Sequence, residues 1–318
     1  MKVLITGAAG FIGSVTAAYL LDHGYEINAL DDLSEGHERQ IDRRANFFQG
    51  SILDFGAINE AIAGCQAVVH LAGKAIVSES TQDPHKYQLH NHIGTRNLLI
   101  SMVGNTVKQI IFSSTCAVYG NPNVESISEQ TIPIPINPYG KSKLLADLEI
   151  SNFTEKYNLN SISLRFFNVA GSYTNNSNQL FGELHKNETH LIPRILTQQN
   201  IEIYGSNFNT PDGTCVRDYV HVLDIAHAIK LSLENKTSPG HKIYNLGSGI
   251  GASVKDIIQA VESILNREIT KTSGERRAGD PDYLVSDSNL VRKELGWATR
   301  FDLQQMIIDT QKFIEKNS

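Results

Sequence analysis

The sequence has few cysteines, no excess of basic residues and no long apolar run. Each of these three absences excludes a class of protein. Only Cys65, Cys116 and Cys215 occur in 318 residues, so neither a disulfide framework nor a cysteine zinc site is indicated. Lys and Arg number 28 against 34 Asp and Glu, a net charge of −6 that predicts no nucleic-acid partner. No apolar stretch approaches the roughly 18–20 residues of a membrane span.

The remaining composition is that of an ordinary globular chain. It is 41% hydrophobic and 19% charged, and its length predicts a large core divided between two lobes. The first residues already have the pattern of a strand and a phosphate-binding turn, which leaves no room for a signal peptide. We therefore expect a cytoplasmic protein. His85, His90 and His92 crowd one segment, but their spacing lacks metal-ligand geometry, so we expect no metal site.

The chain opens with the pattern of a strand, a glycine-rich turn and a helix. Residues 2–6 are apolar and rich in branched side chains, as in a buried parallel strand. Gly7, Gly10 and Gly13 follow in a G-x-x-G-x-x-G arrangement, and residues 14–23 have the pattern of a helix. Glycines at these positions let the backbone approach a pyrophosphate at the helix N-terminus.

A second apolar run, residues 25–30, ends in two aspartates. Asp31 lies 18 positions after Gly13, where a carboxylate binds the adenosine ribose hydroxyls of a dinucleotide. A carboxylate at this place repels a 2′-phosphate. The pattern therefore predicts NAD, rather than NADP, as the cofactor.

A tyrosine and a lysine stand four residues apart, at the start of an expected helix of residues 139–157. Tyr139 and Lys143 would leave the same helical face, and an ammonium near a phenol favours the phenolate. Thr115 ends an apolar run, where the carboxyl end of a strand would present its hydroxyl. Such a set could deprotonate an alcohol while its carbon is oxidised. The alternative is that the pair merely decorates a helix.

Further segments alternate between strand and helix patterns. We expect strands at 46–49, 67–71, 109–112, 161–166, 202–204 and 242–246, and helices at 54–63, 84–104, 222–233, 253–265, 288–295 and 302–316. The helix at 222–233 and the strand at 242–246 should return to the first lobe. The segment 247–251 lacks the Lys-Ser/Thr of a P-loop and is interpreted as a turn. Trp297 is expected in the core.

These motifs together resemble the extended short-chain dehydrogenase/reductases, and within them the UDP-glucose 4-epimerase group. The resemblance rests on GAAGFIGS at 7–14, HLAG at 70–73, FSSTCAVYG at 112–120, NPYGKSK at 137–143, RFFNVAG at 165–171, HLIP at 190–193, DGTCVRDYVHV at 212–222, YNLGSG at 244–249 and RRAGDP at 276–281. It implies an α/β fold with a Rossmann-type doubly wound parallel sheet and a smaller C-terminal α/β lobe. Residues 1–171, with returning segments near 218–250, would bind NAD, and residues 172–318 would mainly bind substrate.

The resemblance also implies which residues form the site. Those that would bind NAD are Gly7, Gly10, Phe11, Ile12, Gly13, Asp31, Asp32, Leu33, Ser51, Ile52, Leu71, Ala72, Gly73, Lys74, Asn91 and Phe167. Those that would bind a UDP-sugar are Thr115, Tyr139, Asn168, His190, Leu191, Tyr204, Arg217, Arg277 and Asp280, with Thr115, Tyr139 and Lys143 catalytic. The expected helices 84–104 and 139–157 correspond to a dimer interface in relatives, which implies a homodimer.

Several of these assignments keep an alternative. Ser51 stands where the family usually has an acidic residue, and Lys74 lies one place before the family's lysine, so their contact with NAD stays open. Asn91 would either bond within the cofactor pocket or brace the strand crossing it. Phe167 would lie near the nicotinamide or simply in the core. Arg217 would clamp a diphosphate or pair with Asp218.

The implied reaction is NAD-dependent epimerisation at C4 of a UDP-hexose, UDP-galactose to UDP-glucose, through a transient 4-keto sugar. Cys116 and Ala117 follow Thr115 where a 4,6-dehydratase usually has Asp-Glu, which argues against dehydration. An epimerase for UDP-N-acetylhexosamines stays open, because Leu284, at the family's gate position, has intermediate bulk. A uronate epimerase also stays open, because the sequence does not exclude the extra positive group facing C6 that it would need. A non-enzymatic NAD-binding sensor would typically lack the Tyr–Lys pair.

Overall fold

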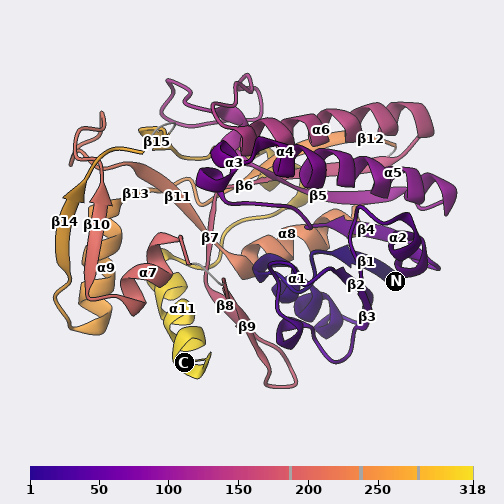
Figure 1. Ribbon diagram of the computed structural model, residues 1–318, viewed down its shortest axis with the longest axis horizontal. Helices are drawn as coiled ribbons and strands as arrows, with labels where there is room; N and C mark the ends of the chain where they lie inside the picture. The colour runs from indigo at the N-terminus through magenta and orange to yellow at the C-terminus, as the bar shows by residue number, and fades with distance from the viewer. Residues whose placement is uncertain (186–187, 236–238, 278–279, 318) are drawn as a thin grey trace.

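The fold is centred on a seven-stranded parallel sheet. The computed structural model describes residues 1–185, 188–235, 239–277 and 280–317 (Figure 1). The strands run in the order β12-β6-β5-β4-β1-β2-β3, and every neighbouring pair is parallel. Their bounds are β1 Lys2–Thr6, β2 Glu26–Asp31, β3 Asn46–Gln49, β4 Ala67–His70, β5 Gln109–Thr115, β6 Asn160–Phe166 and β12 Gly240–Leu246. The predicted doubly wound parallel sheet is confirmed.

Helices cover both faces of this sheet. One face carries α1 (Phe11–Asp22), α8 (Val222–Glu234) and α10 (Asn289–Leu295), and the other carries α2 (Phe55–Ile62), α5 (Gly94–Gly104) and α6 (Pro138–Tyr157). In β1, Val3 and Ile5 join the core on the α1 side, whereas Leu4 joins the core on the α2 side. Side chains of a strand alternate between its faces, so a strand covered on both faces is apolar throughout.

The second lobe is built from shorter strands around β11 (Val216–His221). This strand pairs with β13 (Gly251–Ser253), β15 (Tyr283–Leu284) and β7 (Asn168–Ala170). Two further pairs are β10 (Asn200–Tyr204) with β14 (Thr270–Gly274), and β8 (Ser172–Thr174) with β9 (Leu180–Gly182). The helices α7 (Leu191–Thr197), α9 (Val254–Leu265) and α11 (Leu303–Asn317) lie in this lobe (Figure 1). The strand β12 lies at the edge of the seven-stranded sheet, and α8 packs against α1.

Local signals explain where the central helix α6 begins and ends. Asn137 precedes it, and its side-chain oxygen accepts a hydrogen bond of 2.8 Å from the Gly140 N–H. Pro138 occupies the first turn, where its missing N–H costs nothing. The helix ends at Asn158, which adopts the left-handed conformation with φ of 55°. The predicted helix carrying Tyr139 and Lys143 is confirmed.

One predicted helix is less regular than expected. Residues 84–104 form α4 (Pro84–Tyr87), a π-helical stretch (Gln88–Ile93) and α5, preceded by a short helix α3 (Val77–Gln82) that the sequence pattern did not indicate. Widened turns of this kind often mark functional positions, and this one contains Asn91. The remaining predicted strands and helices are found within a few residues of their expected ends.

Two smaller predictions are also confirmed. The segment 247–251 is a turn, and Trp297 is 1% exposed with its indole N–H donating to the Asp224 carbonyl at 2.8 Å. The described residues also include short 3₁₀ helices at Glu38–Gln40 and Cys116–Tyr119. Within the described ranges, no helix combines the length and apolar character needed to cross a membrane.

Candidate active site

The glycine-rich turn lies between β1 and α1, as its spacing predicts. Gly7 has a φ of +72°, and a Cβ on it would lie 2.6 Å from the Ala72 nitrogen. A Cβ on Gly13 would lie 1.9 Å from the Gly7 oxygen, so a side chain at either position requires the backbone to move. Gly10 precedes α1, which has no side-chain cap and no acidic residue in its first turn. The N–H groups at the start of this twelve-residue helix, which begins with Phe11 and Ile12, lack a side-chain cap and therefore suit an anion.

Asp31 lies at the carboxyl end of β2, beside this turn. Its two carboxylate oxygens accept hydrogen bonds from the Ala9 N–H at 2.9 Å and the Leu33 N–H at 2.8 Å. Leu33 is in the left-handed region with φ of 58°. Burial raises the pKa of the Asp31 carboxyl. Each oxygen keeps a lone pair, so this carboxylate can accept hydrogen bonds from two ribose hydroxyls. Its neighbour Asp32 accepts from the Ser34 N–H at 2.9 Å.

The segment after β4 is held close to the glycine-rich turn. Leu71 and Ala72 bond to Thr6 at the end of β1, at 3.1 and 3.3 Å. The Asn91 side chain accepts from the Lys74 N–H at 2.7 Å and donates to the Lys74 carbonyl at 2.9 Å. It also donates to the Ser142 hydroxyl on α6 at 3.0 Å. These contacts favour the bracing role for Asn91.

Lys74 and Gly73 have distinct surroundings within this segment. The Lys74 ammonium donates to Ser34 Oγ and Glu35 Oε1, both at 3.0 Å, and so connects the segment to the loop after β2. A Cβ on Gly73 would lie 2.8 Å from Asn91 Oδ1 and 3.4 Å from Lys143 Nζ. The Gly73 backbone therefore lies against the lysine of the predicted catalytic set.

The structure brings Thr115, Tyr139 and Lys143 together. Lys143 is buried, and its ammonium donates to the Ser113 carbonyl at 2.8 Å, two residues before the end of β5. The Thr115 hydroxyl at that end contacts the Tyr139 phenol. The Tyr87 ring meets the Tyr139 ring edge to face, with centroids 6.3 Å apart. Strand β5 and helix α6 thus supply all three members of the set.

Burial is the largest influence on the pKa of the Tyr139 phenol and on that of the Lys143 ammonium when no cofactor is bound. It raises the pKa of Tyr139 to about 12, although the Thr115 hydroxyl acts in the opposite direction. It lowers the pKa of Lys143 to about 8, against the pull of the Asp147 carboxylate. The sequence pattern predicted a phenol whose pKa is lowered by the lysine. The chain alone does not provide that lowering, because burial raises the pKa of the phenol by more than its contacts lower it; the Lys143 ammonium itself donates to the Ser113 carbonyl.

A buried polar network behind this set was missed by the sequence analysis. Asp147 lies one helical turn after Lys143 and accepts from the Ser114 hydroxyl at 2.8 Å and from Arg165 at 3.3 Å. Arg165 also donates to the Tyr119 hydroxyl at 2.9 Å. The network joins β5, α6 and β6. The four-residue spacing of Asp147 from Lys143 was the available signal.

The predicted diphosphate side lies in the second lobe. Arg217 pairs with Asp280 and donates to the Val216 carbonyl at 2.8 Å, and it does not pair with Asp218. The Arg277 guanidinium lies 3.9 Å from the centroid of the Tyr204 ring. These two arginines are therefore held by separate partners. Within the RRAGDP motif, residues 278–279 lie outside the described chain.

A third arginine beside them was not singled out from the sequence. Arg276 lies 4.1 Å from the Phe208 ring centroid and pairs with Asp282 at 2.7 Å. It therefore repeats the arrangement of a guanidinium over an aromatic ring.

Other predicted residues occupy defined places. Phe167 and Leu284 are buried in one apolar cluster with Cys116, the residue after Thr115. Phe167 is therefore a core residue that also lies close to the Thr115–Tyr139–Lys143 set. Asn168 begins β7 opposite Tyr219.

The predicted residues Ser51 and Ile52 lie just after β3. The Ser51 hydroxyl accepts from the Leu53 N–H at 3.3 Å. Ile52 is buried, and a Cβ on Gly94 would lie 2.5 Å from its side chain. Both residues therefore have contacts within the fold.

Leu191 begins α7, and the preceding His190 faces Glu183 and Glu188. Those two carboxylates, His185 and His190 form one compact group that the sequence analysis did not single out.

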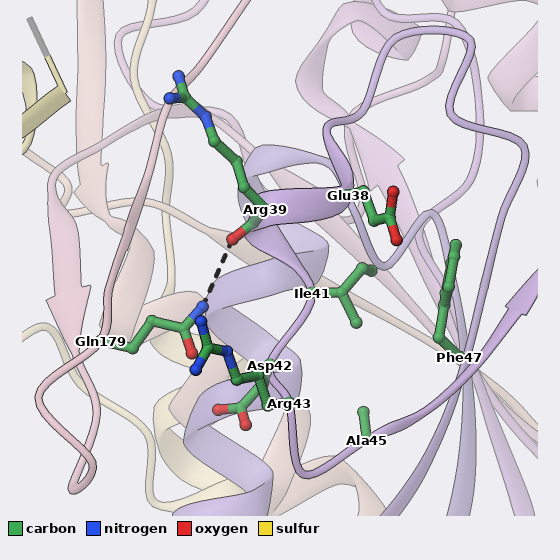
Figure 2. A pocket seen from close by; sticks show the side chains of 8 residues that line it. All are labelled: Glu38, Arg39, Ile41, Asp42, Arg43, Ala45, Phe47 and Gln179. Atoms are coloured by element: carbon green, nitrogen blue, oxygen red, sulfur yellow. Dashed lines mark hydrogen bonds between the residues drawn. The ribbon is translucent and has the colours of Figure 1, made fainter.

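A surface hollow elsewhere does not contain this set (Figure 2). It lies between the loop from β2 to β3 and Gln179, whose side chain donates to the Arg39 carbonyl at 3.4 Å. Its lining residues are Glu38, Arg39, Ile41, Asp42, Arg43, Ala45, Phe47 and Gln179. None of the predicted site residues is among them.

Comparisons with known proteins agree with this geometry. The model of the NAD dependent epimerase/dehydratase family matches residues 3–247. A UDP-glucose 4-epimerase of Lacticaseibacillus casei is 40% identical, over 98% of this chain and 95% of its own. The crystal structure of UDP-glucose 4-epimerase from Brucella ovis in complex with NAD is 39% identical, with 98% of each chain covered and a TM-score of 0.92.

The structure of the Bifidobacterium longum UDP-glucose 4-epimerase in complex with NAD⁺ and UDP is 31% identical. It covers 100% of this chain and 99% of its own, with a TM-score of 0.93. Together with the glycine-rich turn and the Thr–Tyr–Lys set, these matches identify the chain as a member of the NAD-dependent epimerase/dehydratase family.

Proposed function

We propose that this protein interconverts UDP-galactose and UDP-glucose by inverting C4 of the sugar, with NAD as its cofactor. The observation that carries this proposal is the Thr115–Tyr139–Lys143 set beside Gly73, in a chain that matches UDP-glucose 4-epimerases over nearly its full length. Residues 1–171, with the segments returning near 218–250, would bind NAD. Residues 172–318 would mainly bind the UDP-sugar.

The described residues fit NAD in three respects. The glycine-rich turn has no room for side chains at Gly7 and Gly13, and the start of α1 is uncapped. The Asp31 carboxylate lies beside it with free acceptor capacity. When bound, NAD supplies the reversible oxidation at C4 that this reaction needs. The Asp31 carboxylate disfavours NADP, because it would repel a 2′-phosphate.

Tyr139 is the proposed base for the sugar's 4-hydroxyl. Its phenol oxygen would take that proton and return it when the new configuration forms, with the Thr115 hydroxyl bonding the same oxygen. Because burial holds the pKa of the free phenol at about 12, the base needs additional positive charge nearby. Lys143 lies in the same buried site but does not lower that pKa in the chain alone, so the positively charged nicotinamide of bound NAD would supply the additional charge. Cys116 rather than an acid follows Thr115, which favours epimerisation over dehydration.

The 4-keto sugar must rotate within the site, to present its opposite face, while the nucleotide stays bound. Arg217, Arg277 and Asp280 are the proposed partners of the diphosphate and ribose, with Asn168 as a further donor to the phosphates. A guanidinium can hold a diphosphate through two parallel hydrogen bonds. Leu284, buried beside Cys116, would limit the bulk admitted at the sugar. We therefore propose unsubstituted UDP-hexoses as the preferred substrates.

The test is conversion of UDP-galactose to UDP-glucose by the purified chain with NAD. Tyr139→Phe should abolish conversion while NAD binding, followed by titration, stays within a few-fold of the wild type. Tyr157→Phe, which removes a phenol at the far end of the same helix, is the matched control and should stay active. Full activity of Tyr139→Phe would refute the assigned base, and no conversion by the wild type would refute the epimerase.

We also propose a homodimer formed through α5 and α6. Ile100 on α5 and Leu148 on α6 are exposed by 44% and 53%, and the two helices pack side by side (Figure 1). Leu148→Glu should convert the dimer to a monomer in light scattering. Ile308→Glu on α11, where the isoleucine is also 44% exposed, should not. A monomeric wild type would refute this assembly.

The proposed location is the cytoplasm. All three cysteines are free thiols in the structure, as expected in a reducing compartment. Fractionation of cells that express the chain would test this, and recovery outside the cytoplasmic fraction would refute it.

A further inference from the structure

Four side chains between β9 and α7 form a compact group that supplies no acid or base to the proposed reaction, although the resemblance places His190 among the residues that would bind the UDP-sugar. They are Glu183, His185, Glu188 and His190, and one ligand atom from each lies within 4.8 Å of all the others. It is the only group of three or more potential metal ligands within residues 1–185, 188–235, 239–277 and 280–317. We propose that this group binds one divalent transition-metal ion, with Zn²⁺ as the best fit, and that the ion fastens the chain between β9 and α7.

The spacing of the ligand atoms carries the first part of the argument. His185 Nδ1 lies 3.2 Å from Glu183 Oε1 and 3.4 Å from Glu188 Oε2, and His190 Nδ1 lies 3.5 Å from Glu188 Oε1. A tetrahedral zinc with bonds of about 2.0–2.1 Å separates its ligand atoms by about 3.3–3.4 Å. These separations are close to such edges, but they involve both Glu188 oxygens, so the side chains must shift for four ligand atoms to surround one ion. His190 Nδ1 approaches Glu183 more closely still.

A second observation concerns Glu183 alone. The residue is 7% exposed, and the partners of its Oε1 among the described residues are the two imidazoles, with His185 Nδ1 at 3.2 Å. A buried carboxylate needs a cation nearby, and a metal ion held by neutral imidazoles would supply it. This oxygen is the one that both imidazoles face. Two carboxylates and two neutral imidazoles around a divalent ion give a site with no net charge.

The surroundings make one side of the group rigid and leave the other open. Gly182, before Glu183, accepts from the buried Gln40 side chain at 3.1 Å, and a Cβ on it would lie 2.5 Å from the Phe313 ring of α11. At the other end, the His190 side chain is 54% exposed. A metal ion can therefore enter from solvent and reach a ligand that the fold already holds in place.

The chemistry of the donors selects the ion. Imidazole nitrogen suits zinc and other late transition metals, whereas Mg²⁺ and Ca²⁺ prefer sites made of oxygen atoms. Four protein ligands would close the coordination sphere, as in structural zinc sites. The ion would therefore stabilise the chain and take no part in the reaction. Its presence is independent of the proposed epimerase activity.

The test measures metal content directly. Tag-free wild-type chain, loaded with Zn²⁺ and dialysed, should retain one zinc per chain by mass spectrometry, and Co²⁺ in its place should give the visible absorption of a tetrahedral site. Glu183→Gln and His185→Gln should retain less than a tenth of that zinc. His85→Gln, which changes an exposed histidine outside the group, should retain all of it.

A second readout keeps the proposal testable if Glu183→Gln fails to fold. Chelation should lower the thermal midpoint of the wild type, and Zn²⁺ should restore it, whereas His185→Gln should respond to neither. Retention of no zinc by the wild type would overturn the proposal and leave the four side chains as an ion-paired network of protonated histidines. Equal zinc in the wild type and His185→Gln would overturn it as an adventitious ion only.

Discussion

Asp218 provides the sharpest prediction about stability, because one fully buried carboxylate accepts five hydrogen bonds. Its Oδ1 accepts from the Ser248 N–H at 2.7 Å and the Ser248 hydroxyl at 2.6 Å. Its Oδ2 accepts from the Gly249 N–H at 3.0 Å, the Ser286 N–H at 3.0 Å and the Ser286 hydroxyl at 2.6 Å. This carboxylate therefore holds the turn at 247–251 and the residues after β15 against β11.

Asp218→Asn keeps the size of the side chain and replaces one acceptor oxygen by a donor. With the amide nitrogen at the Oδ1 position, the Ser248 N–H loses its partner. At the Oδ2 position, the Gly249 and Ser286 N–H groups lose theirs. Either serine hydroxyl can rotate and accept instead. One or two charge-assisted bonds are lost, worth about 1.5–3 kcal/mol each, and the neutral amide is cheaper to bury. We expect a net destabilisation of about 2–5 kcal/mol.

Chemical denaturation and amide hydrogen exchange would measure this effect. Exchange should quicken at Ser248, Gly249 and Ser286, because their N–H groups lose an acceptor. Asp54→Asn is the matched control, since Asp54 caps α2 at the surface and Asn caps a helix equally well. Its stability should stay within about 0.5 kcal/mol of the wild type. An Asp218→Asn variant as stable as this control would refute the reasoning.

Three further predictions concern the cofactor side of the site. Lys143 has a pKa of about 8 in the fold against 10.5 when unfolded, so the unfolded chain binds more protons between these pH values and the stability of the fold rises with pH there. The stability advantage of Lys143→Met over the wild type in denaturation should therefore shrink by on the order of 3 kcal/mol from pH 8 to 10.5. A difference that stays constant with pH would contradict this. Asp31→Ser should improve NADP binding relative to NAD at least tenfold in titrations, and Asp32→Ser should not. Gly73→Ala should weaken NAD binding and activity at least tenfold, because its Cβ meets Asn91 Oδ1 at 2.8 Å; Gly104→Ala, with open space at its Cβ, is the control.

The framework of the fold was predictable because its signals are local. The apolar run of β1, the glycines that follow and the capping by Asn137 each act within a few residues. The same holds for the Tyr139–Lys143 spacing, since one helical turn places both side chains on one face. The π-helical stretch around Asn91 had no local signal, and the Asn91 side chain bonds to Lys74, 17 positions earlier in the chain, and to Ser142, 51 positions later.

The partners of Arg217 and Asp218, at the proposed diphosphate site, could also be predicted only in part. Arg217 and Asp218 are neighbours in the sequence, which made their ion pair a plausible alternative. Adjacent residues of a strand point to opposite faces, so Arg217 meets Asp280 while Asp218 meets the turn at 247–251. Strand alternation would have rejected the pair, but the sequence analysis predicted no strand at 216–221, where β11 lies. The identity of each new partner was beyond the sequence, because Asp280 and Ser286 are more than 60 positions away.

Acidity is the property of the site that the sequence predicted least well. Spacing indicated a phenol made more acidic by a nearby ammonium, yet burial acts more strongly on Tyr139 and raises its pKa to about 12. The surroundings of the Tyr139 phenol include Thr115 at the end of β5 and the Tyr87 ring, and no local sequence pattern records these contacts. The same burial makes any added charge act through a medium of low dielectric constant, where its effect on a phenol is larger. A site that keeps its base protonated when empty can therefore still ionise it once a cation binds beside it.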